Sequence, residues 1–239
     1  MTDEAIVLAG GLGTRLREVV KDVPKPMAEV NGKPFLDYIL DYLIKNKITK
    51  VILAVGYKHE IIQQHLSQNK KFSDLQISYS IENEPLGTGS AIAQAITKVD
   101  GPYTFIVNGD TFFDIPLNQL ELFAHNKNAK IAIALKELPF SNRYGQVACD
   151  SDDRILSFSE KNQDQRESCI INGGTYIINK TLFKSFDLPQ KFSLENDFFK
   201  PYLKNIQAYG KDFKDFFIDI GIREDYNLAQ KIFKNGITK

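Results

Sequence analysis

Short apolar runs that end at turn residues recur through the first half of the chain. Runs of about four to eight residues with such ends are typical of buried strands, and apolar residues three and four apart are typical of helices. The expected strands cover residues 5–9, 51–55, 77–81, 103–107 and 131–135. The expected helices between them cover residues 35–44, 61–66, 88–96 and 117–125. This alternation predicts an α/β fold with a mostly parallel sheet and helices on both of its faces.

The second half of the chain has a different pattern. Short strand-like runs cover residues 144–148, 155–158 and 174–178, and the polar segment Asp150–Arg154 predicts a hairpin turn between two of them. The expected helices of this half cover residues 194–202 and 224–233. No internal repeat is visible, so we expect one compact unit in which this half adds a small β-rich insert on the substrate side.

Composition and charge narrow the class of protein. Hydrophobic residues make up 43% and charged residues 25% of the chain, which is enough for a packed core. The 30 basic and 30 acidic residues balance, which argues against nucleic acid or a membrane surface as a partner, since both usually require a basic face. No run is long enough to span a membrane, and no secretory signal is visible. Cys149 and Cys169 have no metal-ligand spacing, so we expect free thiols in a cytoplasmic protein.

A glycine-rich loop follows the first expected strand directly. Its three glycines let the backbone approach a ligand and turn N–H groups toward phosphate oxygens, and Arg15 adds a planar cation. The loop is not a P-loop, which needs Gly-Lys-Ser/Thr, and Arg15-Leu16 stands where a dinucleotide motif has its third glycine. A tight strand-to-helix turn without a ligand is the alternative interpretation. The candidate nucleotide-binding residues of the loop are Leu8, Ala9, Gly10, Gly11, Gly13 and Thr14.

A second candidate cation, Lys25, lies between two prolines. Pro24 and Pro26 restrict the backbone and remove local donors, so the lysine is held on a stiff segment where it can meet a phosphate. A solvated lysine in a proline turn is the alternative. Together, residues 10–16 (GGLGTRL) and 24–27 (PKPM) resemble the two-part signature of sugar-1-phosphate nucleotidyltransferases.

This resemblance implies a Rossmann-like nucleotide-binding core. It implies a nucleoside triphosphate and a sugar 1-phosphate as substrates, Mg²⁺ as cofactor, and catalytic, phosphate-stabilising roles for Arg15 and Lys25. It covers most of the chain, so we expect a single domain over residues 1–239. The nucleotide-binding half would end at about residue 135, and the rest would bind the sugar and supply a second metal ligand.

Two aspartates are candidate metal ligands because each follows an apolar run. Asp110 comes directly after the expected strand 103–107, and Asp219 stands between an apolar run and Gly221. Carboxylate oxygens suit a hard cation, and the resemblance places Mg²⁺ between these two side chains. A helix N-cap or a turn is the alternative for Asp110. For the three histidines we expect structural or surface roles; they are His59, His65 and His125.

Glu82 is the candidate residue for selecting the base. The resemblance places Glu82, Gly87 and Thr88 beside the nucleobase and ribose. A carboxylate only accepts hydrogen bonds, and guanine offers two adjacent donors, whereas thymine and uracil offer one donor between acceptors. Glu82 therefore favours guanine. The alternative is a glutamate that faces solvent, and the sequence does not determine which way this side chain points.

Short motifs in the chain match the sugar side of the family. The resemblance gives their glycine backbone, carboxylate and amide groups to sugar hydroxyls, and their lysine to the sugar phosphate. Such convergent polar groups and a cation are what a phosphorylated sugar requires. Asn162 stands where many relatives have proline after Glu-Lys. The candidate residues are Asn108, Tyr144, Gly145, Glu160, Lys161, Asn172 and Gly174.

Residues 5–36 and 82–92 resemble, within the family, guanylyltransferases that act on a heptose 1-phosphate. That implies transfer of GMP from GTP and a GDP-heptose product for surface glycans. Open alternatives are another sugar (mannose, glucose or N-acetylmuramate 1-phosphate), another base (UTP or dTTP), and a non-catalytic relative that binds nucleotide-sugars. A Rossmann dehydrogenase is a further reading, weakened by the loop mismatch. Formation of a homo-oligomer and feedback regulation stay open.

Overall fold

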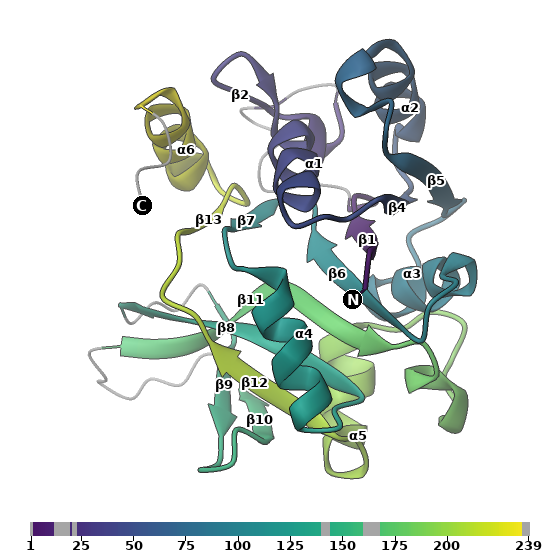
Figure 1. The fold of residues 1–239 in the computed structure, drawn as a ribbon, viewed down its shortest axis with the longest axis vertical. Helices are drawn as coiled ribbons and strands as arrows, with labels where there is room; N and C mark the ends of the chain where they lie inside the picture. The colour runs from purple at the N-terminus through teal and green to yellow at the C-terminus, as the bar shows by residue number, and fades with distance from the viewer. Residues whose placement is uncertain (1, 12–19, 21–22, 140–143, 160–167, 236–239) are drawn as a thin grey trace.

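A computed structural model describes residues 2–11, 20, 23–139, 144–159 and 168–235 of the 239-residue chain, without the side chains of Ser159 and Asn235. Nine strands of this described part form one large sheet (Figure 1). They are β1 (Glu4–Leu8), β4 (Lys50–Val55), β5 (Gln76–Ile81), β6 (Tyr103–Asn108), β8 (Ile131–Pro139), β9 (Gln146–Cys149), β10 (Ile155–Ser159), β11 (Ser168–Asn179) and β12 (Ala208–Asp212).

The strand order is β10-β9-β11-β6-β1-β4-β5, with β8 paired to β11 and β12 paired to β8. Strands β6, β1, β4 and β5 run parallel, as do β8 and β12. Within this sheet, the antiparallel pairs of the described strands all involve β9 or β11, which belong to the second half of the chain. The mainly parallel α/β sheet predicted from the sequence is confirmed, and its parallel part places several strand ends at one edge.

Two short two-stranded sheets lie outside the large one. They are β2 (Glu29–Val30) with β3 (Lys33–Pro34), and β7 (Thr111–Phe113) with β13 (Phe217–Asp219). The described α-helices are α1 (Phe35–Lys45), α2 (His59–Gln68), α3 (Thr88–Ala95), α4 (Leu117–Asn126), α5 (Lys200–Tyr202) and α6 (Arg223–Asn235). Short 3-10 helices are η2 (Lys25–Met27), η3 (Lys70–Phe72), η4 (Ile96–Lys98), η5 (Leu182–Ser185) and η7 (Leu203–Asn205), and η6 (Leu194–Phe199) is a π-helix.

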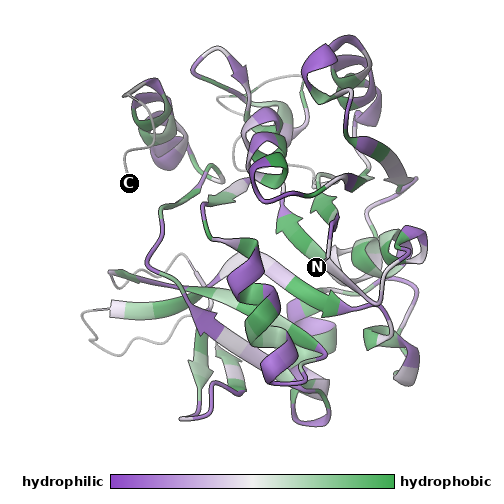
Figure 2. Ribbon diagram, in the orientation of Figure 1, coloured by the Kyte–Doolittle hydropathy of each residue, from purple (hydrophilic) through white to green (hydrophobic). Residues whose placement is uncertain are grey.

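Alternate side chains of the parallel strands enter two apolar clusters, because successive residues of a strand face opposite sides of the sheet. Ala5 and Val7 of β1 pack with residues of α1, α2, α4 and α6. Ile6 packs on the other face with α3 and with the segment 192–206. Figure 2 shows hydrophobic residues along the strands and hydrophilic residues on the outer sides of the helices. Helices therefore cover both faces of the sheet, as predicted.

The second half of the chain differs in detail from the predicted elements. The strand expected over residues 174–178 extends over Ser168–Asn179, because β11 pairs with β6, β8 and β9. The hairpin turn at Asp150–Arg154 is confirmed, since the Asp150 N–H donates to the Arg154 carbonyl at 3.0 Å. The helix expected over residues 194–202 consists of the π-helix η6 followed by the short α5.

Candidate active site

The carboxyl ends of three parallel strands meet at the edge where the candidate residues lie. In the ladder between β1 and β6, Leu8 is opposite Asn108, and the Gly109 N–H donates to the Leu8 carbonyl at 2.9 Å. A Cβ on Gly109 would lie 2.7 Å from that carbonyl oxygen, so only glycine fits there. On the other side of β1, the Ala9 N–H donates to the Ala54 carbonyl of β4 at 2.7 Å. In open α/β sheets, ligands bind at this edge.

A cleft with a volume of about 270 Å³ opens at the same edge. It brings together segments far apart in the sequence, and apolar side chains such as Ala54 and Ala91 complete its wall. A mostly apolar cavity with a few converging polar groups is typical of a ligand site. The predicted residues that line the cleft are Leu8, Ala9, Gly10, Gly11, Lys25, Glu82, Gly87, Thr88, Asn108 and Asp110.

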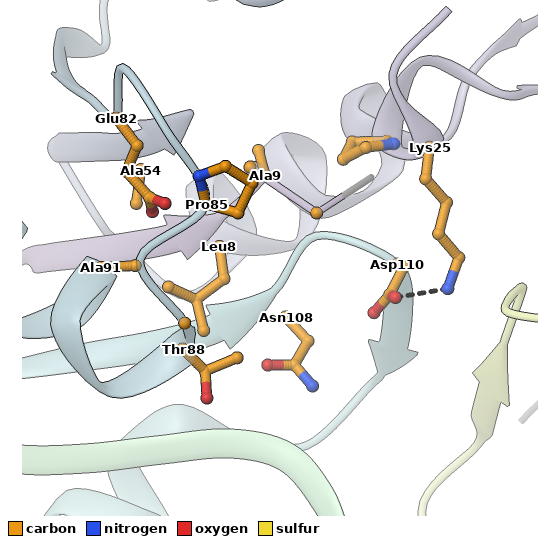
Figure 3. Close-up of a pocket in the computed structure, with 14 residues that line it drawn as sticks. Leu8, Ala9, Lys25, Ala54, Glu82, Pro85, Thr88, Ala91, Asn108 and Asp110 are labelled. Carbon is orange, nitrogen blue, oxygen red and sulfur yellow. Dashed lines mark hydrogen bonds and ion pairs between the residues drawn. The ribbon is translucent and has the colours of Figure 1, made fainter. Parts of the chain in front are cut away.

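The charged residues of the cleft lie at its two ends. Figure 3 shows Glu82 at one end and Lys25 with Asp110 at the other, with Thr88 and Asn108 on the stretch between them. The cleft therefore has a direction, because its two ends differ chemically. The half-buried carboxylate of Glu82 stands at one end, and the cation of Lys25 stands with the carboxylate of Asp110 at the other. One end can accept hydrogen bonds from a neutral group, and the other can hold charged groups.

The side chain of Glu82 forms part of the cleft lining and is half-buried. Its Oε2 accepts a hydrogen bond from the Leu86 N–H at 3.1 Å. Burial raises the pKa of the Glu82 carboxyl, and the Leu86 hydrogen bond acts in the opposite direction. A Cβ on Gly10 would lie 3.5 Å from Oε1, so the glycine-rich loop runs directly beside the carboxylate. Glu82 thus borders the cleft, and its role in selecting the base stays a prediction.

Lys25 lies between the two candidate metal ligands. Its segment is a 3-10 turn in which the Met27 N–H donates to the Pro24 carbonyl at 2.8 Å. The Lys25 ammonium contacts Asp110 Oδ2 and lies 3.8 Å from Asp219 Oδ1. Only 12% of the Lys25 side chain is exposed, so the lysine of a freely solvated proline turn is excluded. One cation thus faces two carboxylates that are 109 positions apart in the chain (219 minus 110).

The pairing of β7 with β13 brings Asp219 to Asp110. Thr111 is opposite Asp219 in this ladder, and the Ile220 N–H donates to the Asp110 carbonyl at 2.9 Å. Burial raises the pKa of the Asp219 carboxyl, and the charge of Asp110 adds to this effect, while Lys25 opposes it. Asp219 therefore lies in a place where a further positive charge would be favourable.

The chemistry of these donors fits a divalent cation. Asp110, in the turn between β6 and β7, and Asp219, at the end of β13, offer oxygen ligands toward the same ammonium. The part of the chain that the structure describes contains no cluster of three or more His, Cys, Asp or Glu residues able to hold a metal. A cation with one or two carboxylates and further ligands from substrate phosphates and water is the arrangement that suits Mg²⁺.

The residues predicted to bind the sugar include Asn108 at the end of β6 and residues of β11 next to it. Gly174 has a φ of +72°, and a Cβ there would lie 2.6 Å from Asn108 Nδ2, so β11 passes close to the end of β6. The Gly174 N–H donates to Asn172 Oδ1 at 3.0 Å. The Tyr144 ring lies 6.1 Å from the Phe217 ring of β13, and Gly145 beside it is exposed. Asn172 and Gly174 thus lie at the end of β6, and Tyr144 lies beside the first residue of β13.

Several predicted residues lie outside the described residues, so their roles stay predictions. They are Gly13, Thr14, Arg15, Glu160 and Lys161.

Three residues near the site were not found from the sequence. A Cβ on Gly221 would lie 2.8 Å from Asp219 Oδ1 and 3.0 Å from Lys25 Nζ, so glycine leaves room for their contact. Tyr176 and Glu195 both accept hydrogen bonds from Asn172 Nδ2, at 2.8 and 3.1 Å. The spacing of Gly221 after Asp219 was a usable signal, whereas an exposed glutamate in a helical segment such as η6 gives none.

The histidines lie outside the cleft lining. His65 Nε2 is 2.7 Å from Asp37 Oδ1, which links α2 to α1. His59 contacts the Gly56 carbonyl, and the His125 ring packs on Tyr103. These contacts agree with structural roles. Both cysteines are free, as expected.

The fold and the cleft are those of an α/β protein with a ligand site at the carboxyl ends of parallel strands. Residues 4–235 match the family model described as nucleotidyl transferase, and the chain belongs to that family. None of the described helices has the length and apolar character needed to cross a membrane.

Two curated relatives are similar over nearly their whole length. The D-glycero-alpha-D-manno-heptose 1-phosphate guanylyltransferase of Campylobacter jejuni is 46% identical over 223 residues, which is 93% of this chain and 96% of the relative. The protein of the same name from Aneurinibacillus thermoaerophilus is 44% identical over 228 residues, covering 95% and 97%. The crystal structure of HddC from Yersinia pseudotuberculosis complexed with GMP-PN has a TM-score of 0.86 and 34% identity, covering 97% of this chain and 100% of that chain.

Proposed function

We propose that this chain transfers GMP from GTP to D-glycero-α-D-manno-heptose 1-phosphate, giving GDP-heptose and pyrophosphate. The single observation that carries the proposal is the direction of the cleft, with an acceptor-only carboxylate at one end and Lys25 between two aspartates at the other. The names of the two relatives above 40% identity and the GMP-PN of the structural neighbour support the base and the sugar.

The base would bind at the Glu82 end. Guanine presents its N1–H and its exocyclic amine side by side, and a carboxylate can accept both. Glu82 Oε2 already accepts from the Leu86 N–H, which fixes the orientation of the carboxylate, and each oxygen has two lone pairs. A uracil or thymine ring would direct a carbonyl oxygen at the same carboxylate, which is repulsive. Gly87 and Thr88 would lie along the ribose.

The reaction would take place at the Lys25 end. An oxygen of the sugar phosphate attacks the α-phosphorus of GTP, a new P–O bond forms, and the bond from the α-phosphorus to the bridging oxygen of pyrophosphate breaks. The protein itself needs to form or break few covalent bonds, so catalysis depends mainly on positioning the substrates and stabilising charge. Lys25 would stabilise the phosphates as negative charge develops on the leaving pyrophosphate. The same role for Arg15, and a hold on the sugar phosphate by Lys161, follow from the family resemblance.

Asp110 and Asp219 would hold the cofactor, for which we propose Mg²⁺. When bound there, the cation would neutralise charge on the reacting phosphates and orient them. The aspartates hold their places through the backbone of β7 and β13 and the Ile220 hydrogen bond to Asp110. Sugar hydroxyls would be bound by groups beyond Asn108, around Gly174 and Tyr144.

Pyrophosphate release tests the proposal. GTP, ATP, CTP, UTP and dTTP are each combined with heptose, mannose and glucose 1-phosphates in the presence of Mg²⁺. We expect release with GTP and the heptose phosphate, at a kcat/KM at least about tenfold above any other pair. Release with a different pair would reject the proposed specificity. Nucleotide binding without release from any pair would favour a non-catalytic relative that binds nucleotide-sugars.

A further inference from the structure

The amide of Asn172 is already occupied by protein groups. The Gly174 N–H can only donate, so Asn172 Oδ1 faces it at 3.0 Å and Nδ2 faces away. Nδ2 then donates to the Tyr176 hydroxyl at 2.8 Å and to Glu195 Oε1 at 3.1 Å. Both N–H groups of the amide are used, so Asn172 has no spare donor for a sugar hydroxyl.

Tyr176 holds this arrangement in place. It lies on β11 with only 4% of its surface exposed, and its backbone is opposite Ile106 of β6. Burial is the main reason that the pKa of Tyr176 is raised well above its ordinary value, and the charge of Glu195 adds to it. The phenol therefore stays neutral and can keep accepting from Asn172. The third member, Glu195, is exposed.

Glu195 has a fixed position relative to the nucleotide side of the cleft. The π-helix η6 that carries it follows directly on a segment docked to the first turn of α3. The Leu194 N–H donates to Thr88 Oγ1 at 3.1 Å, and the Gly89 N–H donates to the Phe192 carbonyl at 3.1 Å. A Cβ on Gly89 would lie 2.2 Å from the Phe192 ring, so this contact requires glycine. Thr88 lines the cleft, so the residue before Glu195 is bonded directly to the cleft lining.

The group of Asn172, Tyr176 and Glu195 also contacts the part of the cleft formed by the end of β6. Asn172 accepts from Gly174, and Gly174 lies against Asn108, which lines the cleft beside Asp110. Glu195 is thus connected through Asn172 to the end of β6 and through Leu194 to Thr88. Glu195 lies in a π-helix, a rare form that replaces the regular hydrogen bonds of an α-helix and occurs frequently at functional sites.

We propose that Glu195 is a specificity-determining residue that accepts hydrogen bonds from hydroxyl groups of the sugar, and that Asn172 and Tyr176 position it. The inference rests on the proposed function. A carboxylate has about four acceptor sites, of which Asn172 uses one, so adjacent hydroxyls can still donate to it. Because Glu195 is exposed, it leaves space for a sugar with an extended exocyclic chain.

The test is Glu195→Gln, which keeps the size of the side chain and removes its charge. A hydrogen bond to a charged group is stronger than one to a neutral group, so KM for the sugar 1-phosphate should rise about tenfold or more. KM for GTP should stay within about twofold of the parent value. The matched control is Asp197→Asn on the same helix, whose carboxylate accepts from the Ser193 N–H, a bond that an amide oxygen can also accept. Asp197→Asn should leave both constants unchanged.

A second readout separates contact with the sugar from a structural role. Monodeoxy derivatives of the sugar 1-phosphate that the parent enzyme uses are compared in parent and Glu195→Gln. One derivative lacks the hydroxyl that Glu195 accepts from, and with it the substitution should have almost no further effect on KM. An equal effect of Glu195→Gln on every derivative, or on KM for GTP, would overturn the proposal.

Failure of the proposed function has a different signature. If the parent enzyme turns over another sugar 1-phosphate or another nucleotide, the function is revised and the Glu195 comparison is made with that pair. Binding of mant-GTP in the absence of sugar checks that the nucleotide side of Glu195→Gln is intact. A melting temperature within a few degrees of the parent checks that its fold is intact, and a lower one is followed by Glu195→Asp, which should restore sugar binding in part. No recovery of KM in Glu195→Asp would overturn the proposal.

Discussion

Selection of the base depends on the single carboxylate of Glu82. It is held by the Leu86 N–H and lies beside the glycine-rich loop, so its orientation does not depend on the ligand. In Glu82→Gln, one acceptor becomes a donor and faces a donor of guanine. We expect kcat/KM for GTP to fall about tenfold to a hundredfold and the preference over UTP to shrink accordingly. Steady-state kinetics with both nucleotides measure this, and an unchanged GTP/UTP ratio would remove Glu82 from base selection.

The pH dependence of GTP use should report the same group. Burial raises the pKa of Glu82 above its ordinary value of 4.5, so it gains a proton at a higher pH than a solvated glutamate. As pH falls through the raised pKa, kcat/KM for GTP should decline, and this decline should be absent in Glu82→Gln. The contribution to the free energy of unfolding has the opposite sign, present below 4.5 and lost as pH rises through the raised pKa. An identical acid limb in both enzymes would contradict this assignment.

Asp219 is expected to matter for the cation rather than for the fold. In Asp219→Asn the site beside Lys25 loses one negative charge, so turnover should fall about a hundredfold or more and the Mg²⁺ concentration for half-maximal rate should rise. The matched control is Asp215→Asn, an exposed aspartate four residues earlier. Rates measured across a Mg²⁺ titration compare the two. Similar losses in both variants would point to a general charge effect instead of a ligand role.

At the scale of elements, α6 holds the Asp219 segment against the segment that follows Lys25. The Tyr226 hydroxyl donates to the Glu29 carbonyl at 2.5 Å, and Gln230 donates to the same carbonyl at 2.6 Å. The Phe233 ring packs edge-on against Phe35 and Phe112. The strand β13 leads directly into α6, so this docking also fixes Asp219 relative to the 3-10 turn of Lys25.

Removal of the Phe233 ring should therefore loosen this docking. Phe233 is 7% exposed, and Phe233→Ala is expected to lower the free energy of unfolding by about 3–5 kcal/mol. The matched control on the same helix is Leu228→Ala, since Leu228 is 48% exposed and should cost less than about 1 kcal/mol. Urea denaturation of the three proteins gives the values. Equal losses in the two variants would show that α6 is not docked through Phe233.

At the scale of the whole molecule, the sequence was most informative where apolar runs end at glycine. The runs at residues 5–9 and 103–107 correspond to β1 and β6 within one residue at each end, because buried parallel strands have little choice of register. Their glycines and Asp110 could then be placed at one edge of the sheet. The mainly parallel fold and the loop and Asp110 parts of the cleft lining followed from these local signals, whereas Glu82, Gly87, Thr88 and Asn108 came from the family resemblance.

Other features depend on contacts between distant segments and could not be read from the chain. The length of β11 is set by pairing with three strands, and its polar Asn172 and paired glycines conceal the strand pattern. The contact of Glu195 with Asn172 depends on the docking of the π-helix η6 on α3. The room that Gly221 leaves for Lys25 appears only when β13 is paired with β7.

The most direct test of the central claim is a competition in one vessel. Equal concentrations of GTP, ATP, CTP, UTP and dTTP are mixed with equal concentrations of D-glycero-α-D-manno-heptose, mannose and glucose 1-phosphates and Mg²⁺. The nucleotide-sugars formed are separated by chromatography against standards, which resolves the isomeric mannose and glucose products, and are identified by mass spectrometry. Competing substrates are consumed in the ratio of their kcat/KM values, so one reaction ranks every pair. We predict that GDP-heptose is the dominant product. A dominant product with another base or another sugar would contradict the account.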